Sequence, residues 1–114
     1  MKKNNKKVIR PSPSSIKHIK RYNNLFLNKS NIMKENFRKN GIYMISSNFN
    51  SKIYIGRSVD LGSRFRNYLS ENYLKKQLCK NKSIIYSALL KGGYNNFELY
   101  ILEYCDKNSI VKRE

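Results

Sequence analysis

The sequence predicts a small domain of mixed α/β structure, of the α+β type, in which helices flank a three-stranded antiparallel sheet. Two β-prone runs separated by turn residues stand near the middle of the chain, and helical spacing of apolar residues follows them. The chain has 114 residues, which is enough for one domain with one small core. The expected order of elements is β-β-α-α-β, followed by the start of a further helix.

A β-hairpin opens the predicted domain at Gly41. The runs Ile42–Ile45 and Ile53–Ile55 are β-prone, and the turn-forming segment Ser46–Lys52 separates them. This pattern is typical of two antiparallel strands joined by a polar loop. We therefore expect two paired strands here.

Two helices are predicted after the hairpin. Ser58 or Asp60 can cap the first helix, which should run to about Tyr73 and whose apolar residues share one helical face: Leu61, Phe65, Tyr68 and Leu69. Ser83 can cap the second helix, which should end at Gly92–Gly93. Its expected buried side consists of Ile84, Ile85, Ala88 and Leu89.

The end of the chain should return to the sheet. Apolar and polar residues alternate well enough from Phe97 to Tyr104 to predict a third strand. A turn is expected over Asp106–Ser109, and Ile110–Glu114 is typical of the first turn of a third helix.

Residues 1–40 differ in composition from the rest of the chain. They are rich in lysine, their only acid is Glu35, and their apolar residues show no sustained helical periodicity. The sequence therefore predicts a basic arm over residues 1–40, disordered or loosely helical, followed by the folded domain over residues 41–114. A mitochondrial import signal is a second interpretation of the arm. Its lysine content favours a phosphate-binding arm, or read-through from an upstream reading frame.

The formal net charge of +17 comes from 24 lysines and arginines against seven acids, and it favours a polyanionic partner such as DNA. Cys79, Cys105 and His18 have no metal-ligand spacing, so neither a zinc site nor a disulfide framework is expected. No apolar run approaches the ~20 residues of a membrane span, and the N-terminus lacks a secretory signal. We expect no membrane partner, no small-molecule cofactor and no secretion.

Two tripeptides lie on the two predicted strands of the hairpin: Gly41-Ile42-Tyr43 and Tyr54-Ile55-Gly56. Arg64 and, one helical turn later, Tyr68 follow on the first predicted helix, and Glu114 ends the chain. In this order the chain resembles the GIY-YIG nuclease family from Gly41 to Glu114. It looks most similar to the intron-encoded homing endonucleases of fungal mitochondria, and its residue usage is typical of A/T-rich coding DNA.

The resemblance implies the GIY-YIG nuclease fold and a metal-dependent endonuclease that hydrolyses DNA phosphodiester bonds. It implies that Tyr43 is the general base and that Tyr54, with an outward-facing hydroxyl like that of Tyr43, positions water or phosphate. Arg64 would pair with the phosphate oxygens, and Tyr68 would stand beside it on the same helical face. Glu114 would bind one Mg²⁺ or Mn²⁺ ion.

Four further cations are expected to contact DNA: Arg57, Arg66, Lys75 and Lys76. The resembling family continues past the position of Glu114 with another helix, so the domain is expected to be truncated at its C-terminal end, which leaves the activity of this chain open. A catalytically decayed, nucleic-acid-binding remnant of an intron-encoded reading frame is the alternative function. The mitochondrion is the expected location. The oligomeric state and the DNA target stay open.

Overall fold

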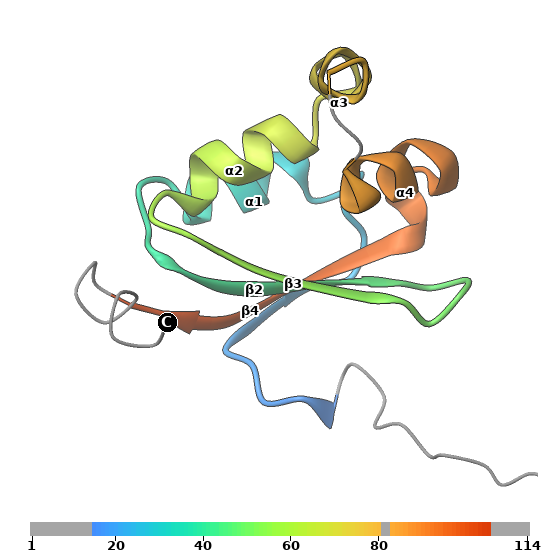
Figure 1. Ribbon diagram of the computed structural model, residues 1–114. Helices are drawn as coiled ribbons and strands as arrows, with labels where there is room; N and C mark the ends of the chain where they lie inside the picture. The colour runs from blue at the N-terminus through green and yellow to red at the C-terminus, as the bar shows by residue number, and fades with distance from the viewer. Residues whose placement is uncertain (1–14, 81–82, 106–114) are drawn as a thin grey trace, which may run out of the picture.

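A computed structural model describes residues 15–80 and 83–105 of the chain. Its helices cover one face of an antiparallel sheet (Figure 1). In chain order the elements are β1 (Lys20–Tyr22), α1 (Lys29–Glu35), β2 (Gly41–Ser47), β3 (Ile53–Ser58), α2 (Leu61–Tyr68), α3 (Glu71–Leu78), α4 (Ile84–Gly92), the 3-10 turn η3 (Tyr94–Asn96) and β4 (Phe97–Tyr104). The predicted mixed α/β class is confirmed.

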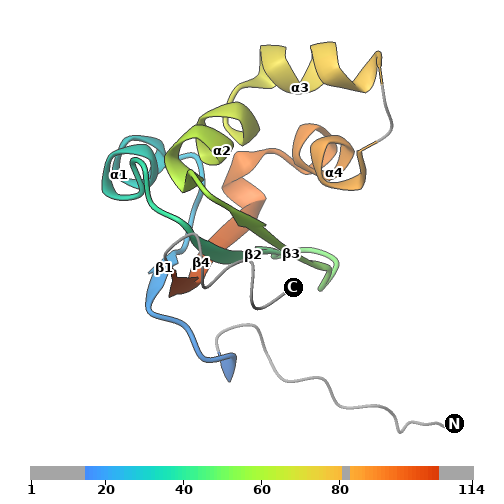
Figure 2. The same cartoon turned by 60° about the vertical axis from the view of Figure 1, so that its left-hand side comes forward.

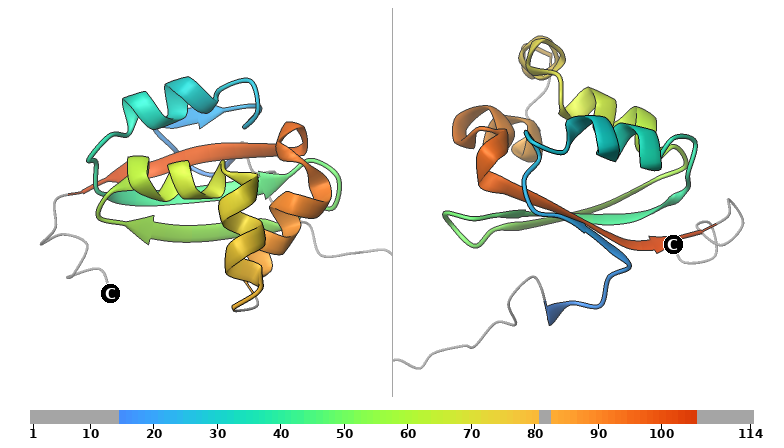
Figure 3. Two further views of the ribbon diagram at one scale, coloured as in Figure 1. Left: turned by 90° about the horizontal axis from the view of Figure 1, so that it is seen from above. Right: turned by 180° about the vertical axis from the view of Figure 1, so that it is seen from behind.

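The sheet has four strands in the order β1-β4-β2-β3, so β2 and β4 are central (Figure 3). All three pairings are antiparallel, and the predicted strand from Phe97 to Tyr104 pairs with β2 as expected. The predicted number of three strands was wrong. The additional strand, β1, comes from the segment that was expected to be a loose arm and pairs with β4 at the edge of the sheet.

The segment from residue 15 to residue 40 is folded in this structure. Leu25 and Ile32 are buried in the hydrophobic core, and α1 lies beside α2 on the sheet (Figure 2). Their contacts reach residues far along the chain: the Leu25 backbone N–H, for example, donates to the carbonyl of Phe97. Contacts of this kind leave no local periodicity, so a sequence pattern does not reveal them. Residues 1–14 lie outside the described part of the chain.

Buried Asn36 fastens this segment to the rest of the domain. Its amide nitrogen donates to the Tyr22 hydroxyl at 3.2 Å and to the Ile32 carbonyl at 2.7 Å. Its amide oxygen accepts from the Tyr104 hydroxyl at 2.7 Å, and its backbone carbonyl accepts from the N–H of Gly62 at 2.9 Å. One side chain therefore joins β1, α1 and β4, while its own backbone holds the start of α2.

The helix predicted to run to Tyr73 is two helices. Leu69 ends α2, and the Ser70 side chain accepts from the backbone N–H of Tyr73 at 3.2 Å as the N-cap of α3. This cap gives the chain a new start and turns α3 away from the axis of α2. The expected buried side of α4 was also partly wrong, because Ile84 is 74% exposed whereas Leu89 is buried. The predicted third helix over Ile110–Glu114 lies outside the described residues.

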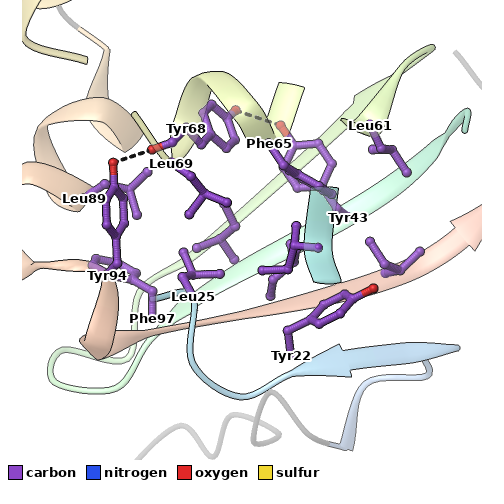
Figure 4. Close-up of a cluster of buried hydrophobic side chains, with 14 of the residues drawn as sticks. Tyr22, Leu25, Tyr43, Leu61, Phe65, Tyr68, Leu69, Leu89, Tyr94 and Phe97 are labelled. Atoms are coloured by element: carbon purple, nitrogen blue, oxygen red, sulfur yellow. Dashed lines mark hydrogen bonds between the residues drawn. The ribbon is translucent and has the colours of Figure 1, made fainter. Parts of the chain in front are cut away.

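The core fills the space between the helices and the sheet (Figure 4). Phe65 and Leu61 of α2 face Leu99 and Ile101 of β4, and all four are almost completely buried. The apolar face predicted for the first helix is therefore the face that packs on the sheet. It fixes how far α2 stands from β2, and so where the polar side chains of α2 lie.

Replacement of Ile32 tests whether α1 belongs to this core. Ile32 is 0% exposed, so Ile32→Ala should lower the free energy of unfolding by about 2–5 kcal/mol in urea denaturation. Leu27→Ala is the matched control, since Leu27 is 75% exposed and its truncation should change stability by less than about 0.5 kcal/mol. Equal, small effects of the two substitutions would show that α1 does not pack on the domain.

Candidate active site

Tyr43 stands at the centre of β2 and points toward the helices. Its register partner on β3 is Gly56, and the Tyr43 ring lies across that glycine. A Cβ atom at position 56 would stand 2.5 Å from the Tyr43 hydroxyl oxygen and 2.7 Å from its ring carbon Cζ. Only glycine leaves room for the ring in this position. The last residue of the second tripeptide therefore accommodates the tyrosine of the first.

The Tyr43 hydroxyl meets two polar groups of α2. It lies 2.7 Å from the Tyr68 hydroxyl, a contact drawn in Figure 4, and Arg64 Nη1 donates to it at 3.1 Å. The edge of Phe65 also packs on the Tyr43 ring, with the ring centroids 5.2 Å apart. Tyr43 of β2 thus meets Arg64 and Tyr68 of α2 at its phenol oxygen.

Local contacts fix the start of α2. The Asp60 side chain caps the helix by accepting from the backbone N–H of Ser63 at 3.1 Å. The N–H of Gly62 is already bonded to Asn36, and a Cβ at Gly62 would lie 2.9 Å from the Cα of Phe37. These contacts therefore fix where α2 begins. Arg64 lies about one turn, and Tyr68 about two turns, from that first residue.

Burial and the neighbouring groups together shift the pKa values of Tyr68 and Arg64. Burial raises the pKa of Tyr68, an effect that the hydrogen bond with Tyr43 reinforces and that Arg64 only partly opposes. Burial also acts against the charge on Arg64, but the neighbouring Tyr43 and Tyr68 outweigh it, so the pKa of Arg64 is raised. Tyr68 consequently keeps its proton and Arg64 its charge at neutral pH. Both groups can therefore donate a hydrogen bond to the Tyr43 oxygen.

A cleft of about 430 Å³ adjoins this group, and its lining includes Tyr43, Tyr54 and Tyr68. Ser83, Ile84 and Ile85, at the start of α4, form the opposite wall. The cleft shares three lining residues, Tyr54, Ser83 and Ile84, with a hollow of about 570 Å³ beside it. That hollow extends to the loop between β2 and β3 and is lined by two cations, Lys52 and Lys91.

Tyr54 lies on the same face of the sheet as Tyr43. It pairs with Ile45, two residues along β2 from Tyr43, so the two tyrosines are diagonal neighbours, with Cα atoms roughly 7–8 Å apart. The predicted outward-facing hydroxyls are found only in part. Tyr54 is half-buried, but Tyr43 is only 3% exposed, although it also lines the cleft.

The four predicted DNA contacts do not gather around Tyr43. Arg57 follows Gly56 on β3, so alternation puts it on the opposite face of the sheet from the helices. Arg66 lies on the side of α2 that borders α1, and Lys75 and Lys76 are exposed in the last turn of α3. The structure therefore spreads these cations over three surfaces.

Sequence patterns did not identify the far side of the cleft. Ser83 was assigned only as a helix cap, which it is, and Ile84 was assigned to the core. Lys52 and Lys91 carried no recognisable motif. The signal that was available is the position of Lys52 in the loop after the first tripeptide strand, because loop residues next to a site commonly contact the substrate.

Glu114, the predicted metal ligand, lies outside the described residues. Within residues 15–80 and 83–105, no group of three or more histidine, cysteine, aspartate or glutamate side chains could hold a metal ion. Over the same residues, no helix combines the length and the apolar character that a membrane crossing needs.

Comparison with known proteins agrees with this geometry. Residues 39–114 match the model of the GIY-YIG catalytic domain. The chain is also 35% identical, over 75 residues, to the MSV199 domain-containing protein 146R of Invertebrate iridescent virus 6, a match that covers 65% of this chain and 29% of that protein. No solved structure matches the chain significantly. Since the catalytic-domain model covers well over half of the sequence and the residues of both tripeptides, this chain belongs to the GIY-YIG nuclease family.

Proposed function

We propose that this chain is a metal-dependent DNA endonuclease. Membership of the family implies a nuclease with DNA as its substrate. The observation that carries the proposal further is the Tyr43 oxygen, which has the Tyr68 hydroxyl at 2.7 Å and Arg64 Nη1 at 3.1 Å, in a group where both tyrosines line an open cleft. This arrangement suits the hydrolysis of a phosphodiester, which needs a base for water and positive charge for the phosphate.

Tyr43 is the proposed general base. After its own proton has left to solvent, its oxygen can take one proton from a water molecule in the cleft. That water forms the new bond to phosphorus as the bond from phosphorus to the 3′ oxygen breaks, and the leaving 3′ oxygen takes a proton from solvent. Arg64 and Tyr68 can each donate a hydrogen bond to the ionised oxygen, which stabilises it before the reaction begins. The half-buried Tyr54 lines the same cleft, which supports a role for it in orienting the water or the phosphate.

Arg64 supplies a permanent positive charge at the site. Its Nη1 faces Tyr43, and a guanidinium has further N–H donors that can bond the non-bridging oxygens of a phosphate. Negative charge on those oxygens grows as water attacks, so the interaction strengthens in the transition state. One residue thus serves both the base and the phosphate.

Hard divalent cations such as Mg²⁺ and Mn²⁺ take oxygen ligands, usually with at least one carboxylate. The described lining of the cleft offers hydroxyl oxygens and contains neither a sulfur nor an imidazole ligand. The resemblance of the chain to the family implies that Glu114 adds the carboxylate that would hold one ion. Such an ion would neutralise charge on the phosphate and on the leaving 3′ oxygen.

We also propose a more specific role and a location for this nuclease. Family resemblance and A/T-rich residue usage support a homing endonuclease of mitochondrial location. The same proposal includes DNA contacts by Arg57, Lys75 and Lys76. It also includes contacts of residues 1–14 with backbone phosphates. The hollow lined by Lys52 and Lys91 adjoins the cleft and is suited to the phosphates that flank the cut.

Loss of either donor to Tyr43 should slow cleavage without unfolding the protein. Arg64→Lys and Tyr68→Phe should each lower the rate of nicking of supercoiled DNA roughly 10²- to 10³-fold. Because burial keeps Tyr68 protonated, its substitution should cost the same factor at about pH 6 and about pH 9. Tyr100→Phe is the control: it removes another buried tyrosine hydroxyl, bonded to Glu98 on β4, and should leave the rate unchanged. Equal rates for all three variants would contradict the proposed roles.

Gly56→Ala tests whether the close approach of the Tyr43 ring matters for catalysis. The added methyl group should displace the ring and lower the nicking rate by a factor similar to that of Tyr43→Phe. Because the effect acts through Tyr43, the double variant should be no slower than Tyr43→Phe alone. Additive losses, or a loss explained entirely by unfolding in urea, would show that Gly56 has another role.

Metal removal should separate cleavage from binding. Excess EDTA, or Glu114→Ala, should abolish nicking, and adding Mg²⁺ back should restore it only with Glu114 present. DNA binding in an anisotropy assay should remain close to that of the unmodified chain, since phosphate contacts by lysine and arginine need no metal. Cleavage that persists in EDTA would refute the metal-dependent mechanism.

A further inference from the structure

A groove of about 570 Å³ runs between α1 and α2, on the other side of α2 from the cleft. The two helices lie side by side in the views of Figures 2 and 3. Three of the residues that line the groove are cations, Lys29, Lys34 and Arg66, and none is acidic. The groove is therefore a concentrated positive surface that the proposed chemistry does not use.

The charges of this groove are only weakly compensated. The ion pairs found within the described part of the chain use Lys20 and Arg21. Glu35, the acid on α1, contacts Tyr22 and Lys20. Within residues 15–80 and 83–105, the side chain of Arg66 takes part in no hydrogen bond and no ion pair. An anion that enters the groove therefore need not displace an existing partner of Arg66.

The walls of the groove are held in a fixed relation. The backbone N–H groups of Leu61 and Gly62, at the start of α2, donate to the carbonyls of Lys39 and Asn36 at 2.8 and 2.9 Å. The missing side chain of Gly62 lets the end of α1 come this close. A surface that is already rigid loses little conformational entropy when it binds a ligand.

Phe37 gives the groove an exposed aromatic edge. It is 58% exposed, and the guanidinium of Arg38 lies 5.1 Å from its ring centroid. Exposed aromatic rings among cations are typical of surfaces that bind nucleic acids, because the cations bond phosphates while the ring contacts sugars or bases. An acidic protein segment would use the cations alone. The composition of the groove thus favours a nucleic acid.

We infer that the groove between α1 and α2 is a second DNA-binding site, which holds backbone phosphates outside the catalytic cleft. The inference rests on the proposed function for the identity of the polyanion. One helix connects the two sites, since α2 carries Arg64 toward the cleft and Arg66 toward the groove. A helix with its side chains is about 10–12 Å across, so the two sites are close enough for one DNA duplex to contact both. α1 precedes the catalytic-domain match, which begins at residue 39.

The test uses the full chain and a fluorescently labelled DNA duplex in EDTA, so that no cleavage occurs. Lys34→Gln combined with Arg66→Gln removes two charges from the groove. Lys29 is left intact because its ammonium group also packs on Phe26 and Tyr94. Lys17→Gln combined with Lys80→Gln is the matched control, since both lysines are exposed and neither lines the groove. Thermal unfolding checks that all variants fold.

The salt dependence of binding gives the readout. The groove variant should bind more weakly, and its log-log slope against salt should be smaller than that of the unmodified chain by about 1.8, for two lost phosphate contacts. The control pair should keep a clearly steeper slope than the groove variant. An unchanged slope in the groove variant would overturn the inference, as would weaker binding of poly-glutamate with unchanged binding of DNA.

Nicking assays with Mg²⁺ distinguish this inference from the proposed function. If the groove variant shows a reduced salt slope but the unmodified chain never cuts DNA, DNA binding by the groove is supported and the proposed endonuclease activity is refuted. Normal cutting by the unmodified chain, together with an unchanged slope in the groove variant, would support the endonuclease and refute the groove.

Discussion

The close approach of the Tyr43 ring to Gly56 is the constraint on which the site depends. Tyr43 belongs to a central strand, where a side chain is normally surrounded by its neighbours, and the glycine opens a space on β3 that the ring fills. Its oxygen can then reach Arg64 and Tyr68 of α2. A larger residue at position 56 would occupy the place of the Tyr43 hydroxyl. The pairing of Tyr43 in the first tripeptide with Gly56 in the second is thus required by packing.

The same geometry requires α2 to be held firmly, and the segment before the family domain contributes to this. Asn36 is completely buried, and its amide group bonds Tyr22 and Tyr104, which lie on two adjacent strands. Its carbonyl also accepts the N–H of Gly62 in the first turn of α2. A buried amide that lost one of these partners would carry a penalty of about 1–3 kcal/mol. Residues that precede residue 39 therefore help to position α2, which carries Arg64 and Tyr68.

Elements with a strong local signal could be predicted from the sequence, and elements that depend on distant contacts could not. The hairpin, the buried face of α2 and the Ser83 cap follow from spacing and turn residues, and the meeting of Tyr43 with Arg64 and Tyr68 agrees with the family resemblance. Strand β1 has only three residues and is stabilised by pairing with β4, so its sequence carries no alternation to detect. Helix α1 is short and its one fully buried residue, Ile32, meets a core built mostly of later residues.

The candidate site is built largely from tyrosines, and a tyrosine that acts as a base needs a positive charge beside it. A tyrosine ordinarily holds its proton until about pH 10, whereas an efficient general base titrates near the working pH. Burial alone would make ionisation harder still, as it does for Tyr68 and for Tyr94, whose pKa it raises to about 12. Tyr94 is fixed by donating to the Tyr68 carbonyl at 2.7 Å, so the tyrosines of this core support one another structurally. The proposed base, Tyr43, lies beside a permanently charged group, the guanidinium of Arg64. In the proposed mechanism this one arginine therefore serves both the base and the phosphate.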